Sequence, residues 1–475
     1  MWPFLILLVP AAILAGLLCM RHWRIAIPSV ILWTLVEGAA RKWGFPQYQG
    51  QIYLLKDAVL IASYIGFFTE YRHINPARYM DTTLLAMAGI YILFLFALLL
   101  NPQSPSLALA LVGLKNHLTY LPLALVVPAL INSEQDMYKF IRIFIFATIV
   151  ISLIGLYQFT QPGDAWINLS VSFDNVAVAA DSRFGEQGEG AFRYGRIRTS
   201  GTFSYIGGMT TFVILMVPLI SAMLFTNRLT PMDRRWAYLA LMLCLGASFT
   251  TGARTPIFVL GLGLPVLFGL AVVRGLISTR LFIRLVVAAV FVGFGASLIF
   301  SDAIAALIFR SENADSSTMR LLSPIVETIG AFDASPIFGT GLGTNGNAAS
   351  TIMRSPFQWW LNGHYFEVEA ARIMQETGIF GFVLSYALRV YVVILGLRYA
   401  FRHTNPYFVA LCLAAAFFFT AHIVLFIVNN PLAAVYYYAL LGMVLATGKL
   451  AASQSSAPGV IVPRVNSRAA SPQVQ

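Results

Sequence analysis

Residues 82–100 read TTLLAMAGIYILFLFALLL, a run of 19 residues without a charged side chain. A helix of about 20 apolar residues spans a bilayer, because the hydrocarbon core is about 30 Å thick and each residue advances the helix by about 1.5 Å. The stretch therefore predicts a membrane-spanning helix, and a chain whose main solvent is lipid.

Apolar windows of this kind recur along the whole sequence. We predict spans near residues 2–19, 25–41, 53–69, 82–100, 107–131, 138–159, 206–226, 236–250, 256–273, 283–300, 374–397, 405–428 and 431–449. The first window is followed by Arg21 and Arg24 rather than by small residues, so we interpret it as a retained helix and not as a secretory signal. The predicted fold class is an all-α polytopic membrane protein with about 12–13 transmembrane helices.

The composition excludes a soluble domain. Of the 475 residues, 58% are apolar and only 11% are charged, whereas soluble domains have about 25% charged residues. The net charge of +11 comes from Lys and Arg residues scattered singly between apolar windows, so it does not indicate nucleic-acid binding. Cys19, Cys244 and Cys412 lie in or beside apolar windows and predict neither a disulfide framework nor a zinc site.

Basic residues divide the loops into two alternating sets. The basic set holds Arg21, Arg24, Arg72, Arg78, Lys139, Arg142, Arg228, Arg234, Arg235, Arg274, Arg280, Arg284, Arg398, Arg402, Lys449, Arg464 and Arg468. The other set has few basic residues, namely Arg41, Lys42, Lys56 and Arg254. Because short basic loops stay in the cytoplasm, we predict that the N-terminus lies outside and the C-terminus inside.

This orientation leaves two long loops outside the cytoplasm, each expected to carry short helices. The predicted organisation is N-terminal helices in 1–159, a first external loop at 160–205, central helices in 206–300, a second external loop at 301–373, C-terminal helices in 374–450 and a tail at 451–475. The tail is rich in Ser, Pro and Ala without apolar periodicity, so we predict that it is disordered and cytoplasmic.

Ionisable residues inside the predicted spans gather toward the outer side. Those at outer helix ends are Glu37, Lys56, Asp57, Lys115, His117, Arg254 and His422, whereas Arg389 lies toward the inner side. A charge in the bilayer is costly, so such residues are candidates for function. They suggest a polar cavity that opens outward, although charges at helix ends also extend to the interface without a function.

Arginines mark two of the outward segments. Arg254 follows Thr250-Thr251-Gly252-Ala253 at the predicted start of a helix, where free N–H groups and the helix dipole favour an anion. Arg193, Arg196 and Arg198 stand within six residues at the end of the first loop. Guanidinium groups bind phosphate in a bidentate manner, so both segments suit an anionic ligand. Capping of neighbouring helix carbonyls and contact with lipid headgroups remain alternatives.

The second loop holds the other candidates. After Arg320 comes Pro336-Ile337-Phe338-Gly339-Thr340-Gly341-Leu342-Gly343, which lacks the Lys-Ser/Thr of a nucleotide-binding loop and predicts a tight turn. His364 is the one His in a long external loop, and an ordinary imidazole pKa near 6.5 suits proton transfer at neutral pH. Glu376 begins Glu-Thr-Gly-Ile-Phe-Gly at the entrance to a span.

Taken together, these segments resemble the O-antigen ligase and O-antigen polymerase-like superfamily of bacterial envelope glycosyltransferases. The resemblance covers Arg-rich residues followed by Ser-Gly-Thr-Phe at 196–203, a Gly-Xaa-Arg element at 252–254, and an Arg, a Pro-Xaa-Xaa-Gly-Xaa-Gly stretch, a His and Glu-Xaa-Gly-Xaa-Xaa-Gly at 320–381. Arg196 to Gly207 also matches the Arg-Xaa10-Gly element of polymerase members.

The resemblance implies a reaction and a location. Such enzymes move a glycan from an undecaprenyl-diphosphate carrier to an acceptor glycan or glycolipid at the outer face of the bacterial inner membrane. It implies His364 and Arg254 as catalytic residues, and Arg196, Arg198, Arg320 and Glu376 as residues that bind the diphosphate and substrate. Many other membrane glycosyltransferases hold a metal ion with acidic residues of the short external loop that comes first in the chain. Here that loop, Arg41 to Tyr53, contains no Asp or Glu, so we predict no metal and no cofactor.

Several alternatives stay open at this stage. The Arg196 to Gly207 element favours a polymerase over an O-antigen ligase acting on lipid A-core. A lipid-linked oligosaccharide flippase or other transporter belongs to a different class, but transporters usually place charges near the midplane and have short external loops. A non-enzymatic relative of the same fold, such as a bicarbonate-transport-associated protein, is a further alternative. Partners expected besides the bilayer are chain-length regulator and flippase proteins.

Overall fold

The structure is a computed structural model that describes residues 13–70, 79–162, 165–169, 198–299, 301, 317–346, 349–355 and 366–455. All regular secondary structure within these ranges is helical. The elements are α2 (Trp23–Trp33), α3 (Glu37–Ala39), η1 (Ala40–Gly44), η2 (Pro46–Tyr48), α4 (Gln49–Thr69), α6 (Thr82–Ala97), η4 (Leu98–Leu100), α7 (Leu107–Leu118), α8 (Leu123–Leu130), α9 (Glu134–Thr160), η5 (Trp166–Asn168), α11 (Ile206–Leu224), α12 (Pro231–Thr250), α13 (Arg254–Val273), α14 (Thr279–Ile299), α16 (Ser317–Ala334), α17 (Ala349–Met353), α18 (Glu369–Arg402), α19 (Pro406–Val424) and α20 (Pro431–Ser455).

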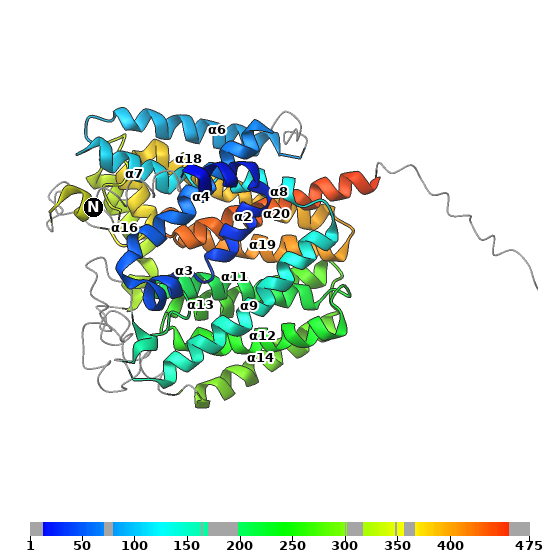
Figure 1. Ribbon diagram of the computed structural model, residues 1–475. Helices are drawn as coiled ribbons and strands as arrows, with labels where there is room; N and C mark the ends of the chain where they lie inside the picture. Colours follow the sequence, from blue (N-terminus) through cyan, green and yellow to red (C-terminus); the bar gives the residue numbers. More distant parts are fainter. Residues whose placement is uncertain are drawn as a thin grey trace, which may run out of the picture.

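The long helices run side by side and form one bundle (Figure 1). Its centre consists of α11, α19 and α20. These helices are apolar on every face, and most of their residues are buried, as expected for central helices. Outer helices expose large apolar side chains instead, including Leu93 (71%), Leu262 (75%) and Phe291 (71%). Such a surface needs lipid around it, because water would make its exposure unfavourable.

The predicted fold class, an all-α polytopic membrane protein, is confirmed. Over the described part of the chain, nine helices are long and apolar enough to cross a membrane, or ten if α2 and the segment Glu37–Gly44, bent by 64°, form one span. The predicted windows 236–250 and 283–300 form α12 and α14, which are not among them. Any window of 18 residues in α12 contains Asp233, Arg234 and Arg235. The first window, 2–19, lies mostly outside the described residues.

The two ends of the bundle hold the two predicted sets of loops. At one end, here called the Arg198 end, the Asn101 amide donates to the carbonyl oxygens of Phe338 and Gly339 (3.0 Å each). At the opposite end, called the Arg228 end, Arg274 donates to the carbonyl oxygen of His403 (2.6 Å). Loops predicted to share a side of the membrane thus meet, while the side that each end faces stays a prediction.

Helix α18 reverses direction at Gly378, whose φ of 68° lies in the left-handed region that favours glycine. Glu369 and Arg389 form an ion pair, yet they would be about 30 Å apart on a straight helix. The arm Glu369–Thr377 is buried throughout and folds back along the rest of α18. Helix α18 therefore begins within the predicted loop 301–373, ahead of the predicted span at 374.

Candidate functional site

A cavity of about 430 Å³ with a mixed polar and apolar lining lies at the Arg198 end. Three segments form its walls: residues 198–211, which include the first turns of α11, the start of α13 around 253–255, and the connection 425–430 between α19 and α20. The size falls within the range of about 300–1,000 Å³ usual for small-molecule sites. The lining mixes hydroxyl, amide and guanidinium groups with Leu425 and Phe426.

Arg198, one of the predicted binding residues, lies in the wall of this cavity. Its Nε donates to the carbonyl oxygen of Thr251 (3.2 Å), which fixes the guanidinium beside the turn before α13. Burial lowers the pKa of Arg198, but a guanidinium stays protonated in proteins. The cavity therefore contains a cation that has lost much of its water, a strong attraction for an anion.

The turn that carries Arg198 is tightly held. Thr199 bonds to Thr250 through its backbone N–H (3.1 Å) and through its hydroxyl (2.8 Å). Gly201 has a φ of 57°, and its N–H donates to the Gln158 side chain of α9 (2.8 Å). The wall is thus fixed from two neighbouring helices before any ligand binds, which is the preorganisation that charge stabilisation requires.

Two buried cations stand directly behind this wall. Arg41 donates to Ser204 Oγ (2.9 Å), and Lys42 Nζ donates to Ser200 Oγ (3.0 Å) and to the carbonyl oxygen of Gly201 (2.7 Å). Ser200 and Ser204 both line the cavity. Arg41 and Lys42 are not among the predicted site residues. Their position as basic residues in a set of loops that otherwise has few of them was the signal that could have found them.

Arg41 belongs to a larger cluster of charged side chains, defined here as Glu37, Arg41, Lys56, Asp57 and Lys115. Arg41 lies 3.7 Å from Glu37, Lys56 Nζ lies 3.1 Å from Glu37, and Lys115 Nζ lies 2.5 Å from Asp57. In this cluster three basic side chains stand against two acidic ones. The predicted outer-end charges Glu37, Lys56, Asp57 and Lys115 therefore do lie together, next to the cavity.

Arg254, a predicted catalytic residue, is the first residue of α13 and stands between the cavity-lining residues Ala253 and Thr255. Arg320 lies on α16, which packs against α18, and its side chain is outside the described part of the structure. Arg196 and His364 lie outside the described residues altogether. The structure thus places Arg198 in the cavity wall and Arg254 beside it, between two lining residues but not itself one of them. The roles of Arg196, Arg320 and His364 stay predictions.

Glu376 is not part of the cavity wall. Its carboxylate accepts hydrogen bonds from the backbone N–H groups of Gly343 (3.1 Å) and Asn345 (3.0 Å), and His117 Nε2 lies 3.8 Å away. The glycine-rich segment forms the predicted tight turns, with positive φ at Gly339, Gly341 and Gly343. In the structure, then, Glu376 holds this segment against the arm Glu369–Thr377.

The third wall of the cavity depends on Glu369. Its carboxylate pairs with Arg389 and accepts the backbone N–H of Ile427 (2.8 Å) and of Asn429 (3.2 Å). Asn430 then donates to Thr211 on α11 (3.1 Å), and both residues line the cavity. Arg389, predicted to lie toward the inner side of its span, therefore helps to position a cavity wall because α18 folds back.

Arg372 is a further cation near the cavity that is not among the predicted site residues. Its Nε donates to the carbonyl oxygen of Phe366 (2.8 Å), and its guanidinium lies 5.6 Å from the ring centre of Phe426, which lines the cavity. Nothing in the local sequence distinguishes it, because this contact forms only when the arm Glu369–Thr377 folds back.

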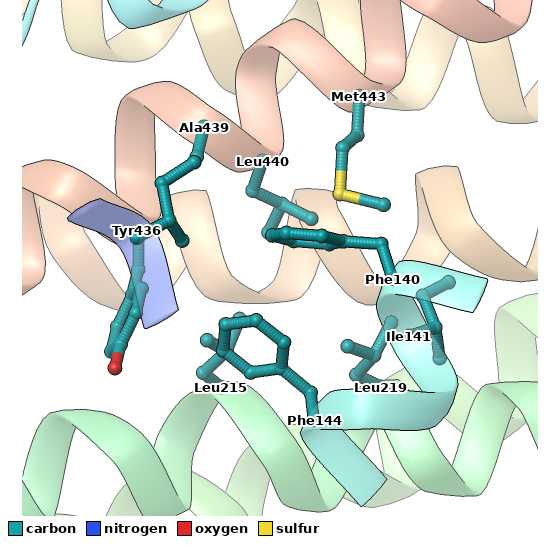
Figure 2. Close-up of a pocket in the computed structure, with 10 residues that line it drawn as sticks. Phe140, Ile141, Phe144, Leu215, Leu219, Tyr436, Ala439, Leu440 and Met443 are labelled. Atoms are coloured by element: carbon teal, nitrogen blue, oxygen red, sulfur yellow. The ribbon is translucent and has the colours of Figure 1, made fainter. Parts of the chain in front are cut away.

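A second cavity, among α9, α11 and α20, has a different character (Figure 2). Its volume of about 30 Å³ is the share of one water molecule in the liquid. Figure 2 shows Phe140, Phe144, Leu440 and Met443 around it, and the hydroxyl of Tyr436 points away from them. That hydroxyl is hydrogen-bonded to Thr34 (3.1 Å), so this cavity is a packing void.

Comparison with known proteins does not identify a family: no family model matches the chain, and no curated protein matches it. Within the ranges that the structure describes, no group of three or more His, Cys, Asp and Glu side chains is arranged to hold a metal ion.

Proposed function

We propose that the chain is a bacterial cell-envelope polysaccharide polymerase. It transfers undecaprenyl-diphosphate-linked glycan repeat units to the hydroxyl of an acceptor sugar at the periplasmic face of the inner membrane. The observation that carries the proposal is the cavity at the Arg198 end, with Arg198 in its wall and Arg41 and Lys42 behind it. A cationic cavity at the end of a lipid-embedded bundle suits a substrate with a lipid tail and a charged head.

The reaction explains why cations are needed. The acceptor oxygen forms a bond to the anomeric carbon, and the bond between that carbon and a diphosphate oxygen breaks. The electron pair of the broken bond leaves with the lipid diphosphate, on which negative charge grows. Preorganised cations stabilise this charge, and the removal of a single such donor typically costs about 10²–10³ in rate. Arg198 and Arg254 have this role, with Arg196 and Arg320 assigned to it from the sequence.

The acceptor hydroxyl must also lose its proton. We assign this proton to His364, because an imidazole accepts a proton at neutral pH and general-base catalysis contributes about 10²–10⁴ in rate. Glu376 contributes indirectly, since it holds the glycine-rich segment and not the cavity wall. No step uses a metal ion, so activity of the purified protein is expected to survive a chelator.

The direct test is a transfer assay with the purified full-length protein and one lipid-diphosphate-linked repeat unit as both donor and acceptor. A polymerase lengthens the glycan on the carrier, and His364→Ala lowers the rate by about 10²–10⁴. His22→Ala is the matched control, because His22 is exposed near the start of α2. Transport across vesicles without any new glycosidic bond would show a flippase, and loss of activity on chelation would exclude the metal-independent reaction.

The glycans that accumulate after deletion of the gene distinguish a polymerase from an O-antigen ligase. Deletion of a polymerase leaves single repeat units on the final acceptor. Deletion of an O-antigen ligase leaves long chains on the lipid carrier. The proposal predicts the first result, and the second would replace it with the ligase.

A further inference from the structure

Two serine hydroxyls in the cavity wall point to a binding mode beyond the arginines. Lys42 and Arg41 carry N–H donors only, so in their hydrogen bonds Ser200 Oγ and Ser204 Oγ are the acceptors. Each serine keeps its own proton for another partner. In the described part of the chain, neither hydroxyl donates to a protein acceptor, and both serines line the cavity.

The cations behind the serines are deeply buried, with Lys42 1% and Arg41 4% exposed. Arg41 has a carboxylate partner, Glu37, at 3.7 Å. Among the described side chains, Lys42 has no carboxylate within ion-pair distance, and it bonds to Ser200 and to the carbonyl oxygen of Gly201. Because the surroundings are poorly hydrated, the hydrogen bond from Lys42 polarises Ser200 and makes that hydroxyl a stronger donor.

Close packing fixes the positions of the two segments. A Cβ atom added at Gly38 would lie 2.1 Å from the backbone nitrogen of Ser204, so the helix start around Glu37 lies directly on the turn 200–204. Thr202 donates its hydroxyl to the carbonyl oxygen of Leu35 (2.5 Å) and adds a second contact. The two hydroxyls are therefore presented to the cavity by a rigid support, without reorganisation on binding.

We propose that Ser200 and Ser204, with Lys42 and Arg41 behind them, form an anion-binding wall that takes a diphosphate group. The identity of the diphosphate as a lipid carrier rests on the proposed function, but the wall itself does not. Arg198 supplies direct charge from the same turn, and the serines supply hydrogen bonds with cationic support. Such a wall binds a polyanion without placing two further flexible cations in the cavity.

The test is equilibrium binding of inorganic pyrophosphate to the purified full-length protein in lipid nanodiscs. Ser200→Ala and Ser204→Ala should each weaken binding by about 10- to 100-fold, because each variant loses a hydrogen bond to a charged group. Ser200→Thr retains a hydroxyl and should retain affinity. Lys42→Met should weaken binding at least as much as Ser200→Ala, and Lys42→Arg should restore part of it, which a purely structural role would not produce.

Lys449→Met is the matched control. Lys449 holds the carbonyl oxygens of Pro128 and Ile131 (2.9 Å each) at the Arg228 end, as Lys42 holds Gly201 at the Arg198 end. Its loss should leave pyrophosphate affinity unchanged. The proposal is overturned if wild-type protein does not bind pyrophosphate, if both serine variants bind as wild type does, or if Lys449→Met weakens binding equally. Serine-dependent binding without glycan transfer would instead refute only the polymerase.

Discussion

The two ends of the bundle use charged residues in opposite ways. At the Arg198 end, Arg41 and Lys42 are almost completely buried and lie against the wall of a cavity. At the Arg228 end, the arginines are half exposed, with Arg142 51%, Arg228 59% and Arg398 45% accessible. Their carboxylate partners stand at helix starts, where Asp81 caps α6 and Asp233 lies in the first turn of α12.

The difference in burial indicates that the charged residues at the two ends have different roles. Exposed ion pairs contribute only about 0–1 kcal/mol and cost little, so those of the Arg228 end are ordinary helix-terminal charges. Burial of a charge costs several kcal/mol even when it is paired. Around Glu37 and Asp57 the buried and partly buried basic side chains outnumber the carboxylates. This burial is therefore unfavourable for folding alone, and an anionic ligand would offset its cost. Matched substitutions at the two ends test this difference.

The largest effect is expected for arginine removal. Arg198→Ala removes a cation from the cavity wall and should lower the rate of glycan transfer by about 10²–10³. Arg228→Ala removes an exposed partner of Glu134, 3.7 Å away, and should leave the rate unchanged. The transfer assay measures both. Equal losses in the two variants would remove the distinction between the ends.

A smaller effect, on stability, is expected for the carboxylates. Glu369→Gln leaves the buried guanidinium of Arg389 without its charge partner, which should destabilise the fold by about 3–5 kcal/mol. Glu134→Gln weakens a surface pair and should cost about 1 kcal/mol or less. Thermal denaturation in one detergent compares them. Similar melting temperatures for the two variants would show that the fold-back of α18 does not depend on this pair.

The smallest expected effect is on the pH dependence of stability, through the Asp81 carboxyl at the Arg228 end. Burial would raise the pKa of the Asp81 carboxyl, but hydrogen bonds from Tyr391 (2.6 Å) and from two backbone N–H groups, with the charge of Arg398, hold it below its ordinary value. A lowered folded-state pKa means that the ionised form stabilises the fold. This stability is present above the unfolded-state pKa, and it is lost as the pH falls through the folded-state pKa.

Asp81→Asn keeps the helix cap but cannot ionise. At neutral pH it should be less stable than wild type by about 0.3–1 kcal/mol. The difference in stability between wild type and Asp81→Asn should become smaller as the pH falls below about 4, the ordinary range of an aspartate pKa. Melting temperatures of both proteins across this range provide the measurement. A difference that stays constant with pH would contradict the assigned pKa shift.

Hydropathy predicted the membrane class, and the spacing of basic residues predicted which loops share an end of the bundle. Both properties could be predicted because lipid and water select which residues lie in the spans and which lie in the loops. The same patterns led to Arg198 in the cavity wall and to Arg254 next to the lining residues Ala253 and Thr255. Lys42 stood out in the sequence as a basic residue in a set of loops with few others, but its contact with Ser200 could not be predicted, since the two residues are separated by 158 positions. The reversal at Gly378 could not be predicted either, because the sequence stays apolar through the turn. This reversal brings Arg389 to Glu369 and Arg372 to Phe426, residues that are far from them in the sequence.

The proposed function requires that the Arg198 end faces away from the cytoplasm and binds an anionic lipid diphosphate there. Cysteine labelling tests its first requirement directly, in a background where Cys19, Cys244 and Cys412 have been replaced. Tyr205→Cys places a thiol at the cavity, and Arg228→Cys places one at the opposite end. A membrane-impermeant maleimide should label Tyr205→Cys in intact cells and Arg228→Cys only after permeabilisation. The reverse pattern would put the cavity in the cytoplasm and contradict the account.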